Sequence, residues 1–86
     1  MTADMKTIQE CLEERKSFRL GARGTCIDFR YSMPSDSWCV RVPRASLNLN
    51  WLEVKIWGNT TLALICCDVS IAYIDLVDFD KVTVIE

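Results

Sequence analysis

The sequence contains no histidine, and this absence excludes several kinds of chemistry. Without an imidazole there is no Cys-His pair, no Ser-His-Asp triad and no histidine-containing zinc site. The side chain best suited to proton transfer near neutral pH is also missing. Glycine is scarce as well, and Gly21, Gly24 and Gly58 are too scattered to form a phosphate-binding loop. We therefore expect a protein that is not an enzyme and that needs no cofactor.

The cysteines do not have the spacing of a zinc site or of a disulfide framework. They lie at positions 11, 26, 39, 66 and 67, without a Cys-x-x-Cys motif and in an odd number. Cys66 and Cys67 end the apolar run LALICC, and adjacent residues of a strand point to opposite faces. We interpret both as reduced thiols in a central strand that is buried on both faces and reacts slowly with thiol reagents.

Three carboxylates, Asp75, Asp78 and Asp80, lie close together near the end of the sequence. Such oxygen ligands suit Mg²⁺ or Ca²⁺, but the glycine and the distal glutamate of a calcium loop are missing. We interpret the segment as a solvated turn and predict no metal site.

The chain is short and rich in apolar residues. Its 86 residues, 50% of them hydrophobic, are expected to form a single domain over residues 1–86. A domain of this size buries only about 60–65% of the surface of its unfolded chain. Some apolar side chains should therefore be covered by another molecule. We expect a homo-oligomer, in the first place a dimer, with a different protein as a further partner.

The sequence gives no indication of a membrane protein. No stretch approaches the roughly 18 consecutive apolar residues of a membrane-spanning helix. The first residues are polar and lack the apolar core of a signal peptide. We therefore expect a cytoplasmic location.

Charge is unevenly distributed, although the formal net charge is only −2. Basic residues dominate from Arg15 to Arg44, and acidic residues dominate from Cys66 onward. We expect these two stretches to pair with each other in the fold. Because the chain is acidic overall, a nucleic acid is the less favoured partner.

One helix is predicted near the N-terminus, over residues 7–18. Thr7 and Glu10 have the spacing of a capping box, and apolar residues follow at helical spacing. Gly21 or Gly24 can supply the left-handed residue that ends the helix.

Short strands of alternating polarity follow the helix. They are predicted over residues 25–32, 37–42, 51–57, 61–67, 71–77 and 81–86, with a loop over 44–50. The turns between them are short, which favours antiparallel neighbours. This order predicts an α+β fold: one N-terminal helix followed by a five- or six-stranded, mainly antiparallel sheet. The sheet is either open or curled into a small, partly open barrel.

The predicted strand 51–57 carries an unusual polar face. Trp51 and Trp57 share this face with Glu53 and Lys55, opposite the apolar residues of the same strand. Tryptophan is enriched among residues that carry binding energy at interfaces. Either the N-terminal helix or the curl of a barrel covers the two tryptophans, or the four residues form an interface. In the second case, alanine at both tryptophans should weaken self-association more than folding.

An alternative interpretation is a small nucleic-acid-binding barrel. Helix followed by five strands is the element order of Sm-like barrels, although the glycine-marked strand motifs of Sm proteins are missing. Aromatic residues interleave with arginines here, so bases would stack while phosphates are neutralised. The contact residues of this alternative are Arg30, Arg41, Arg44, Tyr31 and Trp38. The aromatic residues of the set share their strand face with expected core residues, which weakens this interpretation.

Overall fold

The computed structural model describes residues 4–85, which form one helix and seven strands. Helix α1 spans Met5–Glu14. The strands are β1 Phe18–Ala22, β2 Thr25–Ser32, β3 Ser37–Val42, β4 Leu47–Trp57, β5 Thr61–Cys66, β6 Val69–Asp75 and β7 Lys81–Val84. Two 3₁₀ turns, Pro43–Ala45 and Leu76–Asp78, precede β4 and β7.

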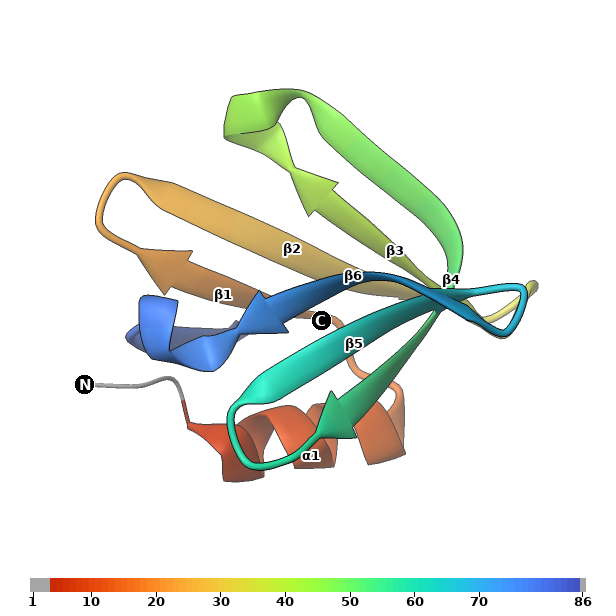
Figure 1. Cartoon of the computed structure of the whole chain (residues 1–86), viewed down its shortest axis with the longest axis horizontal. Coiled ribbons are helices and arrows are strands. Elements are labelled where there is room, and N and C mark those ends of the chain that lie inside the picture. The colour runs from red at the N-terminus through yellow and green to blue at the C-terminus, as the bar shows by residue number, and fades with distance from the viewer. Residues whose placement is uncertain (1–3, 86) are drawn as a thin grey trace.

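All seven strands belong to one antiparallel sheet with the order β6-β5-β4-β3-β2-β1-β7 (Figure 1). The first six strands follow each other as a meander, and β7 returns to pair with β1. This arrangement confirms the predicted α+β class and the antiparallel sheet. The predicted count of five or six strands is too low, and the sheet does not close into a barrel, because β6 and β7 form its two edges.

Helix α1 begins and ends earlier than predicted. Asp4 is its N-cap and accepts a hydrogen bond from the Lys6 amide at 3.0 Å, while the Thr7 hydroxyl donates to the Asp4 carboxylate at 2.8 Å. Arg15, with φ 57°, and not a glycine, is the left-handed residue that ends the helix. The predicted capping box at Thr7 was therefore wrong, because a better acceptor lies three residues earlier.

Two stretches of sheet were missed. Residues 18–22 were interpreted as the end of the helix and its stop, but they form β1 between β2 and β7. Residues 47–50 were interpreted as a loop because they contain asparagines, but they form the first part of β4. Pairing with β2 and β7 in the first case, and with β3 in the second, outweighs the weak local signal.

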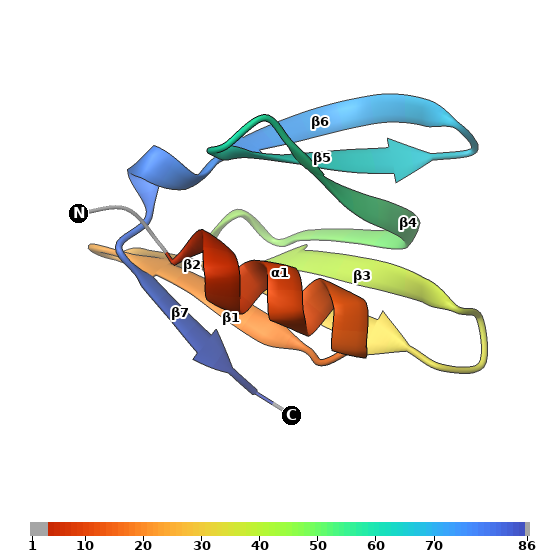
Figure 2. The same cartoon turned by 90° about the horizontal axis from the view of Figure 1, so that it is seen from below.

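The core lies between the sheet and α1, which crosses the inner face of the sheet (Figure 2). It consists of Ile8, Cys11, Phe18, Leu20, Phe29, Trp38, Val40, Leu52, Val54, Leu62, Leu64, Leu76 and Phe79. The connection from β6 to β7 closes one end of this core. Its Leu76 amide donates to the Thr60 carbonyl at 2.7 Å, and its Asp80 amide donates to the Gly21 carbonyl at 3.1 Å.

Strand β4 contains a bulge where it passes from one half of the sheet to the other. Trp38 of β3 pairs with Leu52, but Val40 pairs with Leu49, so β4 holds one extra residue at Asn50–Trp51. Before the bulge β4 pairs with β3, and after it with β5. Among residues 4–85, no helix is long and apolar enough to cross a membrane.

Candidate functional site

The four predicted interface residues of β4 do not all lie together. Glu53, Lys55 and Trp57 point away from the core, and the Lys55 ammonium lies 3.4 Å from the Glu53 carboxylate. Trp51 is also exposed, but it lies at the bulge in the middle of β4. Six residues of extended chain separate the two tryptophans, which is about 20 Å. The structure therefore divides the predicted face into two surfaces.

Trp57 stacks on Tyr73 of β6, with ring centroids 5.2 Å apart and 23° between the ring planes. Both rings remain accessible, at 64% and 53% exposure. Strand β5 passes between them, and its Ala63 is the direct neighbour of Lys55 on one side and Tyr73 on the other. Ala63 faces outward and is nevertheless buried, since its small side chain lies under the larger side chains around it. Together with Ile71 the two rings form an exposed aromatic surface.

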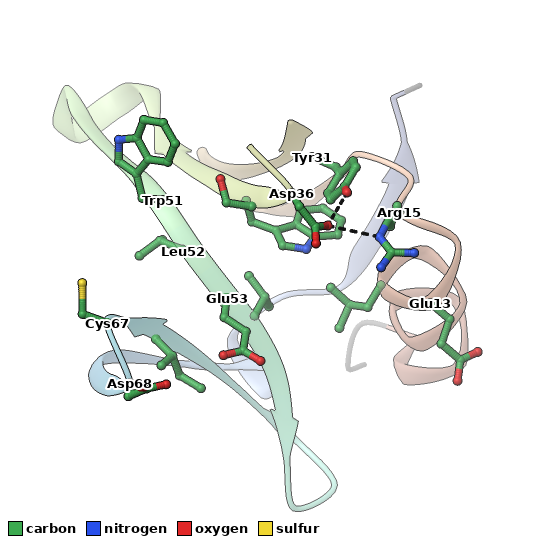
Figure 3. Close-up of a pocket in the computed structure, with 14 residues that line it drawn as sticks. Glu13, Arg15, Tyr31, Asp36, Trp51, Leu52, Glu53, Cys67 and Asp68 are labelled. Atoms are coloured by element: carbon green, nitrogen blue, oxygen red, sulfur yellow. Dashed lines mark hydrogen bonds and ion pairs between the residues drawn. The ribbon is translucent and has the colours of Figure 1, made fainter. Parts of the chain in front are cut away.

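A cleft of about 580 Å³ lies between the end of α1 and the β5–β6 turn, and both Trp51 and Glu53 of β4 line it (Figure 3). Carboxylates surround it: Glu13, Asp36, Glu53 and Asp68. Within residues 4–85, Arg15 is the only basic residue that lines it. The cleft therefore has an acidic character, and its floor contains buried core residues of β3 and β4.

Within the cleft, Asp36 binds both Tyr31 and Arg15 (Figure 3). The Tyr31 hydroxyl donates to the Asp36 carboxylate at 2.5 Å, and the Arg15 Nε lies 3.4 Å from the same oxygen. These contacts lower the pKa of Asp36, chiefly through the tyrosine hydrogen bond and less through Arg15. The same hydrogen bond raises the pKa of Tyr31. Both groups thus move away from neutrality, so neither is suited to exchange a proton near pH 7.

The structure brings together only part of the predicted nucleic-acid set, because Tyr31 lines one hollow with Arg30 and Arg41 while Trp38 is buried. Arg30 and Arg41 are exposed on the outer face of β2 and β3, whereas Trp38 is buried on the inner face and Tyr31 packs edge-on against it. Arg44 donates to the Gly24 carbonyl near the β1–β2 turn. Trp38 is therefore covered by the core, and the face of Tyr31 is already in contact with Trp38 and Arg15.

Asp28 lies at the centre of an arginine cluster on this outer face. It is opposite Arg19 of β1 and Arg41 of β3 in the sheet register, and it is only 3% exposed. Arg19 donates two hydrogen bonds to its carboxylate, at 2.6 and 3.1 Å, and Arg30 Nη2 lies 3.9 Å away. These arginines, Arg19 first, lower the pKa of Asp28. Sequence analysis had not singled out this pair.

The expected pairing between the basic and the acidic stretch is not found. Within residues 4–85, every ion pair joins residues of the same part of the chain, as in Arg15–Asp36 and Lys55–Glu53. The acidic stretch lies mainly in β6, its flanking turns and β7, at the two edges of the sheet. The positive charge of β1–β3 therefore remains available on the outer face.

The interpretation of Cys66 and Cys67 was wrong. Strand β5 ends at Cys66, which packs partly buried against the core, and Cys67 is exposed in the following turn. Cys67 and Asp68 have φ values of 52° and 65°, as two-residue hairpin turns require. Burial on both faces applies only to the middle of β5, where Leu62, Ala63 and Leu64 are buried in succession. The apolar sequence around the cysteines concealed the turn.

We expect Cys67 to react fastest with a thiol-reactive dye in the folded protein, because it is exposed while Cys26, Cys39 and Cys66 are partly buried and Cys11 is buried. Burial raises the pKa of Cys11, and the neighbouring Cys67 raises the pKa of Cys66, so both have less thiolate to react. Stopped-flow labelling of wild type and Cys67→Ser measures the effect. The fastest phase should disappear in the variant; if it persists, the turn is not where the reactive thiol lies.

The candidate metal ligands near the C-terminus do not assemble. The Asp75 carboxylate instead accepts a hydrogen bond from the Val77 amide at 3.1 Å and caps the second 3₁₀ turn. In the part of the chain that the structure describes, no three His, Cys, Asp or Glu side chains lie close enough to share a metal ion.

Fold and surfaces define a small α+β protein with an open seven-stranded antiparallel sheet, an exposed aromatic surface and an acidic cleft. Comparisons with models of protein families, with curated proteins and with solved structures found no match to this chain.

Proposed function

We propose that this protein is a small, non-enzymatic docking module that associates with a second copy of itself through the exposed aromatic surface. The stacked pair of Trp57 and Tyr73 is the observation that carries this proposal. Large exposed apolar groups with charged neighbours are typical of binding sites, and tryptophan and tyrosine dominate their energetics. Stacking restricts both rings before any partner arrives, so less side-chain entropy is lost on binding.

The charges of the surface favour a partner with the same surface. Lys55 and Glu53 already neutralise each other beside the rings, at 3.4 Å. Two copies that meet about a two-fold axis therefore bring no net charge into the contact, and each lysine can approach the glutamate of the other copy.

A face-to-face contact is favoured over pairing between sheet edges. Edge strand β6 contains a bulge, because Ile71 is an extra residue between the pairs Ala72–Leu64 and Ser70–Ile65. Edge strand β7 is only four residues long and begins with Lys81. Bulges, lysines and short strands are features that prevent the addition of further strands. A contact through the outer face of β4–β6 is therefore favoured.

The cleft contains groups that an enzyme could use, including carboxylates, an arginine and the Cys67 thiol. Its two titrating groups in contact, Tyr31 and Asp36, have pKa values displaced away from neutrality. This displacement supports a binding role over a catalytic one. The proposal includes a cytoplasmic location, which is supported by the five free cysteines, since a reducing compartment keeps thiols unpaired.

We expect the double variant Trp57→Ala/Tyr73→Ala to weaken the self-association of the protein at least thirtyfold. Loss of interface residues that contribute about 2 kcal/mol or more produces a change of this size. Sedimentation equilibrium over a wide concentration range measures the dissociation constant, and circular dichroism shows whether the variant is folded.

The matched control is Met33→Ala, which removes an exposed apolar side chain in the β2–β3 turn, outside the aromatic surface. It should leave the dissociation constant unchanged. A wild type that remains monomeric at the highest concentrations would contradict the proposal. A folded double variant with the same dissociation constant as wild type would also contradict it.

A further inference from the structure

Trp51 has an unfavourable backbone conformation that packing does not explain. Its φ is +63°, in the left-handed region that residues with a β carbon rarely adopt. The indole is 69% exposed, so burial in the core does not offset this conformation. Neighbouring residues of β4 hold it there, because the bulge at Asn50–Trp51 interrupts the pairing with β3. The bulge therefore accounts for the positive φ, and both bulges and strained residues are frequent at functional sites.

Beside Trp51 lie two adjoining hollows, on the surface of β2–β4 that faces away from the core. One has a volume of about 480 Å³ and includes Trp51 and Asn50. The other, of about 220 Å³, includes Arg30, Arg41 and Asn48. The two share Ser32, Cys39 and Asn50, so they form one continuous depression. An indole lies at one end of it, and two guanidinium groups lie at the other, with amides between them.

The guanidinium end of the depression carries net positive charge. One carboxylate, Asp28, is surrounded by Arg19, Arg30 and Arg41. Arg19 donates both of the hydrogen bonds that this carboxylate accepts from arginine. Three positive charges and one negative charge leave a local charge of +2. Arg41 has no carboxylate within ion-pair distance among residues 4–85. This end can therefore neutralise an anion without breaking the buried pair.

We propose that this depression binds a single-stranded nucleic acid, with a base stacked on Trp51 and a phosphate between Arg30 and Arg41. Asn48 is the register partner of Arg41 and lies three residues before Trp51, so about 10 Å of strand separates the two ends. The amides of Asn48 and Asn50 lie between, where they can bind sugar or base edges. Stacking combined with phosphate contacts is how proteins bind single strands without strong sequence preference.

This site is independent of the proposed self-association. It uses Trp51 and the outer face of β2, β3 and the first part of β4, whereas the aromatic surface belongs to β4–β6 after the bulge. It also differs from the predicted nucleic-acid set, because Trp51, and not Tyr31 or Trp38, supplies the stacking ring. The two tryptophans of β4 therefore have separate roles.

Fluorescence anisotropy of a short, labelled oligouridylate at low salt tests the proposal. Trp51→Ala should weaken binding about tenfold, as expected for the loss of one base stack. Arg41→Gln should weaken binding and lower the slope of log K against log salt by about 0.7, as expected for one phosphate contact. Trp57→Ala, the matched control with a similarly exposed indole, should bind like wild type while its self-association weakens.

Three results would overturn the proposal. The first is no binding by wild type at low salt, and the second is equal loss in Trp51→Ala and Trp57→Ala. The third is competition by uridine monophosphate that equals competition by the oligonucleotide, since this would assign the site to a free nucleotide. Trp51→Ala should leave self-association unchanged. Anisotropy therefore tests the nucleic-acid proposal alone, and sedimentation equilibrium tests the docking proposal alone.

A second variant, Trp51→Gly, separates function from folding. Glycine adopts positive φ without strain, so the melting temperature should be equal to or higher than that of wild type. Oligouridylate binding should nevertheless be lost to the same extent as in Trp51→Ala. A lowered melting temperature would show that the indole stabilises the fold, and the argument from strain would then fail.

Discussion

Replacing Phe29 with alanine is expected to lower the free energy of unfolding by about 4 kcal/mol. Phe29 of β2 is fully buried and directly opposite Phe18 of β1 in the sheet register. The two rings stack with centroids 4.7 Å apart and 6° between their planes, and Trp38 meets Phe18 edge-on at 5.9 Å. Alanine removes the ring that stacks on Phe18 and leaves a cavity beside two rigid aromatic rings, Phe18 and Trp38, which cannot easily collapse into it.

This loss is large for so small a domain. A chain of 86 residues has a total stability of about 4–13 kcal/mol, at roughly 0.05–0.15 kcal/mol per residue. The variant should therefore approach unfolding at room temperature. Urea titration followed by circular dichroism measures the difference. Phe29→Leu, which retains most of the buried volume, serves as the control and should lose only about 1 kcal/mol. Equal losses in the two variants would contradict the stacked arrangement.

The sequence predicted those strands whose inner face is buried and whose outer face is exposed. In β2 and β3 the alternation is regular, because Phe29 and Val40 face the core while Arg30 and Arg41 face outward. Strand β1 has five residues and directly follows the helix region, so it gave too short a pattern. Strand β1 forms because it pairs with β2 and with β7. Strand β7 is distant from β1 in the sequence, and a local pattern does not indicate pairing between distant segments.

The candidate surfaces were predicted only in part, for a similar reason. Trp57, Lys55 and Glu53 share a face by simple alternation, which the sequence shows. Tyr73 joins them through the register of β5 with β6, and the alternation of Ile71 and Tyr73 was the available signal. Trp51 lies elsewhere because a bulge adds one residue to β4. Asparagine and tryptophan at a bulge look no different in sequence from those in a regular strand.

The bulge in β4 links the two proposals. One strand supplies Asn48 and Asn50 to the basic depression and Trp57 to the aromatic surface. An uninterrupted strand would align Trp51 with Glu53, Lys55 and Trp57 on a single face. Because of the extra residue, the two tryptophans have different neighbours. Trp51 lies beside the amide of Asn50, whereas Trp57 stacks on a second aromatic ring, Tyr73. Two binding surfaces on so small a sheet thus require the irregularity that the sequence conceals.

Replacing Arg19 with alanine is expected to lower the stability of the protein at neutral pH, because it removes the nearest partner of the Asp28 carboxylate. The Asp28 carboxylate is buried and accepts two hydrogen bonds from Arg19, so the variant leaves a buried charge with the more distant Arg30 as its nearest partner. The matched control is Arg23→Ala in the β1–β2 turn, which removes the same charge from an exposed position and should change stability little.

The loss of stability caused by Arg19→Ala should be present at neutral pH and should disappear in acid. In the wild type the pKa of Asp28 is lowered below its usual value, mainly by Arg19, so the pair stabilises the folded state above the pKa of an unfolded aspartate, about 3.9. This contribution is lost as the pH falls through the lower folded pKa, because protonated Asp28 no longer needs a partner. Urea titrations of both proteins at neutral and strongly acidic pH should therefore converge in acid. A difference that stays constant across this range would mean that Arg19 stabilises the sheet by packing and not through the Asp28 carboxylate.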